Sequence, residues 1–205
     1  MRHPLCAAAL TLTIVLSQPL QAQDSTAAGP SILPAARQIA SAVLAAPEQF
    51  RGDASVIGYG VDGKTRELRH GTGALVCLAS DPASERFHVS CYHRSLEPFM
   101  ARGRALRARG VKGDQVDSVR FAEVRSGRLP FPTHPAGLYT LTAPRDSFDV
   151  ETGVVTGGRS LYVVYIRNAT GASTGLPTAP VEGSNAPWIM HAGTPKAHIM
   201  FVGSM

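Results

Sequence analysis

The chain has 205 residues, of which 44% are hydrophobic and 17% charged, and its formal net charge is +5 at pH 7. This composition is typical of a folded globular protein and excludes an intrinsically disordered chain, which has fewer apolar side chains and a higher net charge. Beyond the N-terminal segment no apolar run reaches the roughly 20 residues that span a bilayer, so no transmembrane helix is expected there.

The first 22 residues have the layout of a secretory signal peptide. Arg2 and His3 precede the apolar run 5–16, and a small-residue cleavage site follows at Ala22. We therefore expect an exported protein, periplasmic or secreted, with no transmembrane segment in the mature chain. Residues 23–33 are mostly small and polar and predict a flexible arm, and residues 34–205 predict one globular domain.

The first elements expected are a helix and a β-hairpin. Pro34 is a favourable first residue for a helix, and apolar residues recur at helical spacing up to about residue 46. Strands 54–59 and 65–69 follow, joined by an Asp-Gly turn that is typical of a hairpin. The GxGxxG pattern at 58–63 is interpreted as this turn, because the segment after it is too polar and too short for the helix of a nucleotide-binding loop.

Cys77 and Cys91 are the only cysteines that remain after signal cleavage. They lie in the runs 74–79 and 87–92, which predict adjacent strands, and an even number of cysteines in an exported chain favours a disulfide. The closed loop of about 15 residues would stabilise the fold by roughly 3 kcal/mol. A metal site on both thiolates is the alternative, although no second cysteine pair lies nearby to complete it.

A helix is predicted over 96–108, with Ser95 as its N-cap and Gly110 at its end. Positive charge concentrates around the end of this helix, at Arg102, Arg104, Arg107, Arg109 and Lys112. Such a cluster is typical of a solvated helix C-terminus, and the alternative is a site for a small molecule or an anionic envelope polymer. A nucleic-acid partner is not expected, because the chain has few aromatic side chains to stack on bases.

The remaining elements define the predicted fold class. A helix over 115–127 would place Val116, Val119 and Ala122 on one face. Strand patterns follow at 138–141, 161–166 and 197–202, and a loop rich in Gly, Ser, Thr and Pro covers 168–187. Because helices and strands segregate along the chain, we predict a single α+β domain with a mainly antiparallel sheet and two or three helices.

The C-terminal segment places two histidines among apolar residues. His198 lies in the last predicted strand, and a turn after His191 brings the two side chains toward each other. Both histidines pack as structural side chains, or they line a polar ligand site together with Tyr92, His93 and Trp188. The long loop before Trp188 would form one edge of that site.

Two further patterns bear on catalysis. His93 and Glu97 are spaced like metal ligands on a helix, but His93 precedes the predicted N-cap. Residues 171–175 match GxSxG, with Glu182 and His198 in the order of a serine hydrolase, yet the prolines that follow exclude the helix that such a nucleophile needs. No metal or other cofactor is indicated, and whether the protein is an enzyme stays open.

The C-terminal sequence Pro187-Trp188-Ile189-Met190, followed by Gly193-Thr194-Pro195 and Ala197-His198-Ile199-Met200, resembles the ending of a family of uncharacterised exported bacterial proteins. The resemblance includes Cys77 and residues 91–108, and it covers most of the chain from Gly71 onward. It implies a bacterial, exported setting and transfers no activity. We favour an exported binding or interaction module of the cell envelope, with an exported serine- or metal-dependent hydrolase and a structural envelope protein as alternatives.

Overall fold

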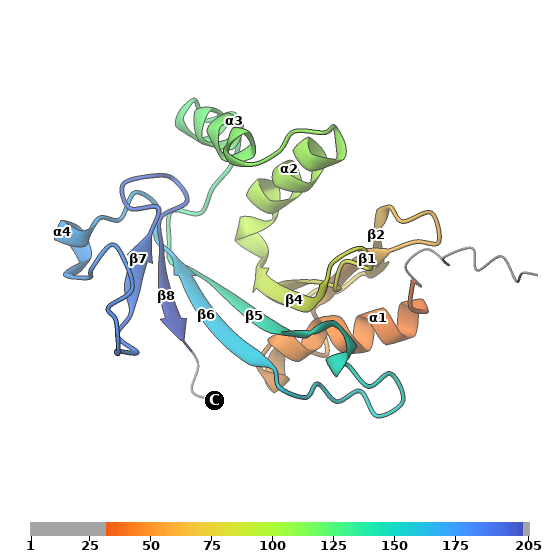
Figure 1. Ribbon diagram of the computed structural model, residues 1–205. Coiled ribbons are helices and arrows are strands. Elements are labelled where there is room, and N and C mark those ends of the chain that lie inside the picture. Colours follow the sequence, from red (N-terminus) through yellow and green to blue (C-terminus); the bar gives the residue numbers. More distant parts are fainter. Residues whose placement is uncertain (1–31, 203–205) are drawn as a thin grey trace, which may run out of the picture.

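An eight-stranded sheet forms the centre of the fold in the computed structural model, which describes residues 32–202 (Figure 1). The predicted signal peptide and residues 23–31 of the predicted arm lie outside the described residues. None of the helices within residues 32–202 has the length and the apolar character of a transmembrane helix. The sheet and its helices form one α+β domain, which confirms the predicted fold class.

The helices and strands largely follow the predicted chain order. The α-helices are α1 (Ala35–Ala42), α2 (Glu97–Ala108), α3 (Asp114–Arg125) and the single turn α4 (Gly171–Thr174). Short 3-10 helices span Val43–Ala45, Glu48–Phe50, Arg94–Leu96 and Arg145–Ser147. The strands are β1 (Ser55–Tyr59), β2 (Thr65–Arg69), β3 (Leu75–Leu78), β4 (Arg86–His93), β5 (Ala136–Pro144), β6 (Arg159–Tyr165), β7 (Trp188–Met190) and β8 (His198–Val202).

The strand order is β2-β1-β3-β4-β5-β6-β8-β7. Every neighbouring pair is antiparallel except β1 and β3, which are parallel. The predicted hairpin forms between β1 and β2, and its turn includes Gly63 with a φ of 70°, a left-handed conformation that glycine adopts without steric cost. After β2 the chain crosses over β1, and β3 then pairs with β1 on the side opposite β2.

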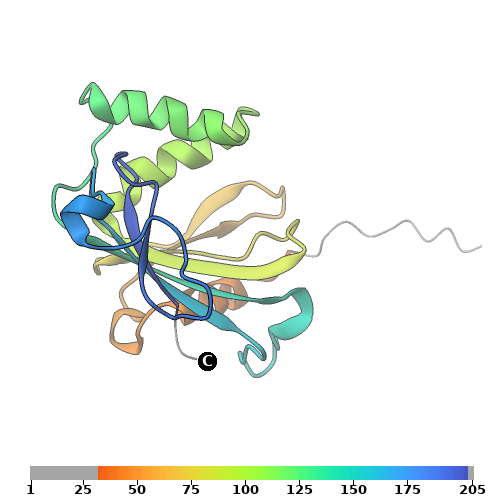
Figure 2. The ribbon, with the colours of Figure 1, turned by 60° about the vertical axis from the view of Figure 1, so that its left-hand side comes forward.

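Side-chain alternation along β4 divides the core into two layers. Phe87, Val89 and Cys91 are buried on the face that α1 covers. Tyr92 faces the opposite layer, where it packs with Phe99 of α2. Figures 1 and 2 show α1 on one side of the sheet and α2 with α3 on the other. Both sides of the central strands are therefore covered, and the ends of the sheet extend beyond the helices.

Helix α3 packs through a face that differs from the prediction. Of the three residues expected to share its apolar face, only Val116 is buried, and the buried positions that follow at four-residue spacing are Arg120 and Val124. The Arg120 guanidinium lies 3.9 Å from the centre of the Phe99 ring. Apolar periodicity missed this face because it does not assign a charged residue to the core, whereas an arginine can stack on an aromatic ring.

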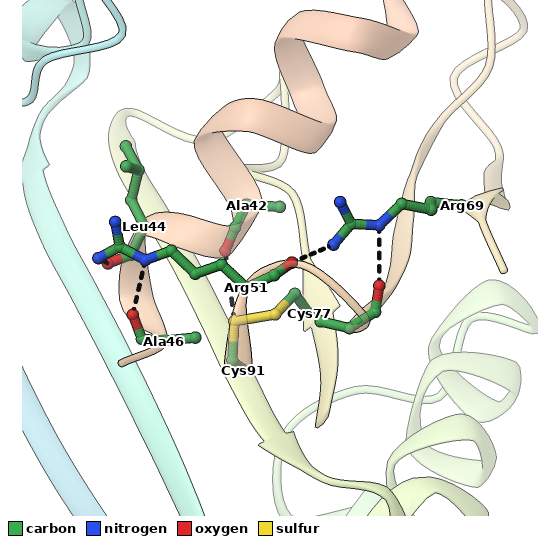
Figure 3. Close-up of a disulfide and its surroundings, with 8 residues drawn as sticks. Ala42, Leu44, Ala46, Arg51, Arg69, Cys77 and Cys91 are labelled. Carbon is green, nitrogen blue, oxygen red and sulfur yellow. Dashed lines mark hydrogen bonds between the residues drawn. A yellow bond between two sulfur atoms is a disulfide. The ribbon is translucent and has the colours of Figure 1, made fainter. Parts of the chain in front are cut away.

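The predicted disulfide joins Cys77 and Cys91, which lie directly opposite each other on β3 and β4 with their Cα atoms 4.0 Å apart (Figure 3). Both cysteines are fully buried beneath α1, and Cys91 Sγ lies 3.4 Å from the Ala42 carbonyl oxygen. Arg51 donates to two carbonyl oxygens in the turn after α1, and Arg69 donates to the Arg51 carbonyl at 2.6 Å. The disulfide and these two arginines tie α1 to three strands.

Candidate functional site

The structure brings two of the predicted site residues together. The rings of His191 and His198 lie 5.5 Å apart between centroids. His198 begins β8 and is buried, with Nδ1 2.7 Å from the Lys196 carbonyl oxygen. His191 follows β7 and has a φ of 53°, in the left-handed region that histidine adopts more often than most residues. Burial lowers the pKa of both imidazoles below the ordinary value of 6.5.

Trp188 lies on the same hairpin as these histidines. It pairs with Met200 on β8, two positions from His198, so the two side chains share one face of the strand pair. The long loop before it approaches this hairpin, since the Ile189 N–H donates to the Pro177 carbonyl at 2.8 Å. The loop therefore packs beside the strand that carries the indole.

Tyr92 and His93 lie elsewhere in the sheet. They end β4, which is separated from β8 by β5 and β6, or about 14 Å for three strand spacings. His93 Nδ1 contacts the Ser95 hydroxyl at 2.8 Å, and its ring meets the edge of His134. The five predicted residues thus form two groups, and His93 does not join the His191–His198 pair.

The side chains of the two catalytic patterns, His93 with Glu97 and Ser173, make structural contacts. Glu97 binds Tyr92 and Arg104, and His93 contacts Ser95 instead. No group of three or more His, Cys, Asp or Glu side chains in 32–202 could hold a metal. The Ser173 hydroxyl donates to the Thr170 carbonyl and accepts from the Thr170 N–H in the cap of α4. Its hydrogen bonds therefore stabilise a helix terminus.

A groove of about 700 Å³ lies between α2 and the face of the sheet opposite α1. We call it the α2 groove. Its floor is formed by alternate residues of four strands, which point to the same face. These floor residues are Ile57, Tyr59, Leu78, Arg86, His88, Ser90 and Thr142. From above, Arg104 and Arg107 of α2 line it, and Asp81 stands at its side.

Positive charge dominates the α2 groove. Three arginines line it, and Asp81 is the carboxylate among the lining residues. Arg86 and Arg107 are exposed, and neither guanidinium group forms an ion pair or a hydrogen bond with another residue of the described chain; Arg86 only donates its backbone N–H to Ser84. Arg104 instead pairs with Glu97 at 2.6 Å. Two guanidinium groups are thus left with their hydrogen-bond donors available to a ligand.

Arg104 is held by a partly buried hydrogen-bond network beside the α2 groove. Its guanidinium donates to the Tyr92 hydroxyl at 2.8 Å and to Glu97 at 2.6 Å, and Tyr92 donates to the same carboxylate at 2.5 Å. Burial raises the pKa of Tyr92, so that the phenol keeps its proton and remains a donor. The network fixes the direction of Arg104 without a ligand.

His88 and Tyr59 add neutral hydrogen-bonding groups. His88 Nδ1 lies 2.8 Å from the Thr142 hydroxyl on the neighbouring strand. Burial and the neighbouring Arg86 lower the pKa of His88 below 6.5, which favours the neutral imidazole at neutral pH. Burial and Asp81 raise the pKa of Tyr59 to about 12, so this phenol is also a donor.

Comparison of the chain with protein-family models, curated proteins and solved structures finds no match.

A second hollow of about 350 Å³ adjoins the α2 groove around the segment 79–86. It lies nearer α1, where Phe87, Phe148 and Ser41 contribute to its lining. Arg86 borders both hollows. Neither hollow is lined by residues of the 168–202 segment, so both are separate from the histidine pair.

Sequence reasoning identified Arg104 and Arg107 within a charged cluster but did not join them to Arg86, His88 and Ser90. The sequence of strand 86–93 does contain a signal for this groove. The strand 86–93 alternates apolar and polar residues although helices cover both faces of its centre. A strand between two helical layers is expected to be apolar on both faces. The polar positions near the start of β4 therefore mark the part of its α2-facing side that α2 does not cover.

Proposed function

We propose that this chain is an exported binding protein that holds an anionic ligand in the α2 groove. The observation that carries the proposal is the placement of Arg86 and Arg107 on a groove of about 700 Å³ with no carboxylate partner within residues 32–202. Guanidinium groups bind carboxylates and phosphates through paired hydrogen bonds. An anion would supply the acceptors that these two side chains lack.

The size and composition of the groove support a ligand site. Small-molecule pockets commonly have volumes of about 300–1,000 Å³ and combine apolar walls with a few polar groups. Here hydroxyl groups of Tyr59, Ser90 and Thr142 stand among the charged and apolar side chains. The hydroxyls can orient an oxygen-rich group, and the guanidinium groups can neutralise its charge.

Two observations support an oxidising compartment for this function. The Cys77–Cys91 disulfide is of the kind that persists outside the reducing cytosol. The N-terminal sequence has the layout of a secretory signal. A bacterial envelope contains many anionic lipids, polymers and metabolites that such a protein could meet.

Thermal unfolding with pyrophosphate and with short dextran sulfate as separate probes tests the proposal. A ligand at about 100 times its Kd stabilises the folded state by about 2.7 kcal/mol, which raises the Tm measurably. We expect at least one probe to stabilise the wild-type protein and the double variant Arg86→Gln/Arg107→Gln to lose this effect.

The matched control is the double variant Arg125→Gln/Arg128→Gln, which lowers the net charge equally at exposed positions that line neither hollow. It should respond to the probes like the wild type. Equal loss in both double variants would attribute binding to overall charge, and no stabilisation of the wild type by either probe would refute the proposal.

A further inference from the structure

The floor of the α2 groove contains an apolar patch among polar residues. Ile57 on β1 pairs with Leu78 on β3, and Leu78 pairs with Ser90 on β4. The first two side chains are half-buried and pack against the core beneath α2. From β4 onward the floor is polar, with His88 opposite Thr142. Ile57 and Leu78 therefore form an apolar patch on the floor, and hydroxyls and cations line the groove around it, with Tyr59 and Thr65 beyond Ile57 on β1 and β2.

We infer that the ligand of the α2 groove is a small amphiphilic anion, a phosphate, sulfate or carboxylate group joined to a short apolar chain or ring. The inference rests on the proposed function and specifies its ligand. The anionic group would contact Arg86 and Arg107, and the apolar part would cover Ile57 and Leu78.

The arrangement of charge favours a single anionic group over a polyanion. Arg86 on β4 and Arg107 on α2 both line the groove, one from the sheet and one from the helix. Arg104 is already engaged by Glu97 and Tyr92. A polyanion carries charge on every repeating unit and would place some of it against Ile57 and Leu78, where no cation lies on the floor.

The apolar wall sets the size of the expected effect. Full burial of one methylene strengthens binding about fourfold, and contact on one side gives about half of that free energy, or roughly twofold per methylene. Hexyl phosphate has five more methylenes than methyl phosphate. We therefore expect hexyl phosphate to bind roughly 30-fold more tightly than methyl phosphate, with the same anionic group in each.

Isothermal titration calorimetry with methyl phosphate and hexyl phosphate tests the inference. Leu78→Asn removes about half of the apolar wall, so it should reduce the ratio of the two affinities to about sixfold or less and leave methyl phosphate binding nearly unchanged. Ile57→Thr, a smaller change, provides the same test if Leu78→Asn does not fold. Leu129→Asn is the matched control, since Leu129 packs at the edge of the same core cluster but does not line the groove.

Arg86→Gln separates the inference from the proposed function. If Arg86→Gln loses affinity for methyl phosphate and for hexyl phosphate, and Leu129→Asn keeps the wild-type ratio of the two affinities, the inference and the proposed function are both supported. If the wild type binds both esters with equal affinity and this binding depends on Arg86, the inferred amphiphilic ligand is wrong and the proposed anion site still stands. Binding of dextran sulfate that depends on Arg86, without binding of either ester, would assign the groove to a polyanion. No binding of any probe would refute the proposed function as well.

Discussion

Asp117→Asn should destabilise the protein through the cation that it leaves buried. Asp117 accepts hydrogen bonds from Arg120 and from Lys196, and the side chains of Asp117 and Arg120 are 20% and 4% exposed. Without the carboxylate, the Arg120 guanidinium keeps the Phe99 carbonyl as a partner, and its buried Nε has no partner within the described residues. Breaking a buried ion pair on one side costs about 3–5 kcal/mol, and we expect about 3 because Lys196 can turn to water.

Urea unfolding followed by circular dichroism measures this loss, and a double variant identifies its cause. Asp117→Asn/Arg120→Met removes both charges and keeps an apolar chain against Phe99, so its stability should return to within about 1 kcal/mol of the wild type. Glu123→Gln is the control, because its partner Arg102 is 28% exposed. This variant should lose less stability than Asp117→Asn. A loss below about 1 kcal/mol in Asp117→Asn, or a further loss in the double variant, would refute the reasoning.

Three further predictions follow from the cysteines and the histidines. Replacing Cys77 and Cys91 by alanine should lower the free energy of unfolding by roughly 3 kcal/mol, because the unfolded chain gains the freedom of a loop of about 15 residues; an unchanged urea midpoint would contradict this. Burial lowers the pKa of His198 in the folded protein, so below pH 6.5 the unfolded chain binds more protons than the folded protein. The free energy of unfolding therefore decreases as the pH is lowered below 6.5. His198→Asn should flatten this decline in urea titrations, and equal slopes in both proteins would argue against it. An anion in the α2 groove should raise the lowered pKa of His88, so affinity should increase as the pH falls from about 7 to about 5.5, and calorimetry in two buffers should show proton uptake that His88→Gln lacks.

Local sequence signals predicted much of the fold. Asp62-Gly63 indicated the β1–β2 hairpin, and Gly63 takes the left-handed conformation that glycine adopts without steric cost. Cys77 and Cys91 lie in strands joined by a short connection, so their pairing follows from the strands themselves. These features depend on residues close together in the chain, where turn chemistry and alternation act directly.

Long-range features were not accessible in the same way. The α2 groove joins β1, β3, β4 and β5 to α2, and no periodicity within one segment indicates which others it will meet. For the same reason the five predicted site residues separated into two groups. His191 and His198 met because one hairpin carries both, whereas His93 lies three strands from His198.

The two edges of the sheet bear on how copies of this protein behave at high concentration. An unpaired edge strand can template the addition of another chain. At one edge, β2 carries Arg66, Glu67 and Arg69, and charged side chains on an edge disfavour pairing with a second copy. At the other edge, β7 has three residues, and the Ile189 N–H is already bound to the Pro177 carbonyl. Within residues 32–202, both edge strands thus carry features that disfavour the addition of a further strand, which reduces edge-to-edge aggregation.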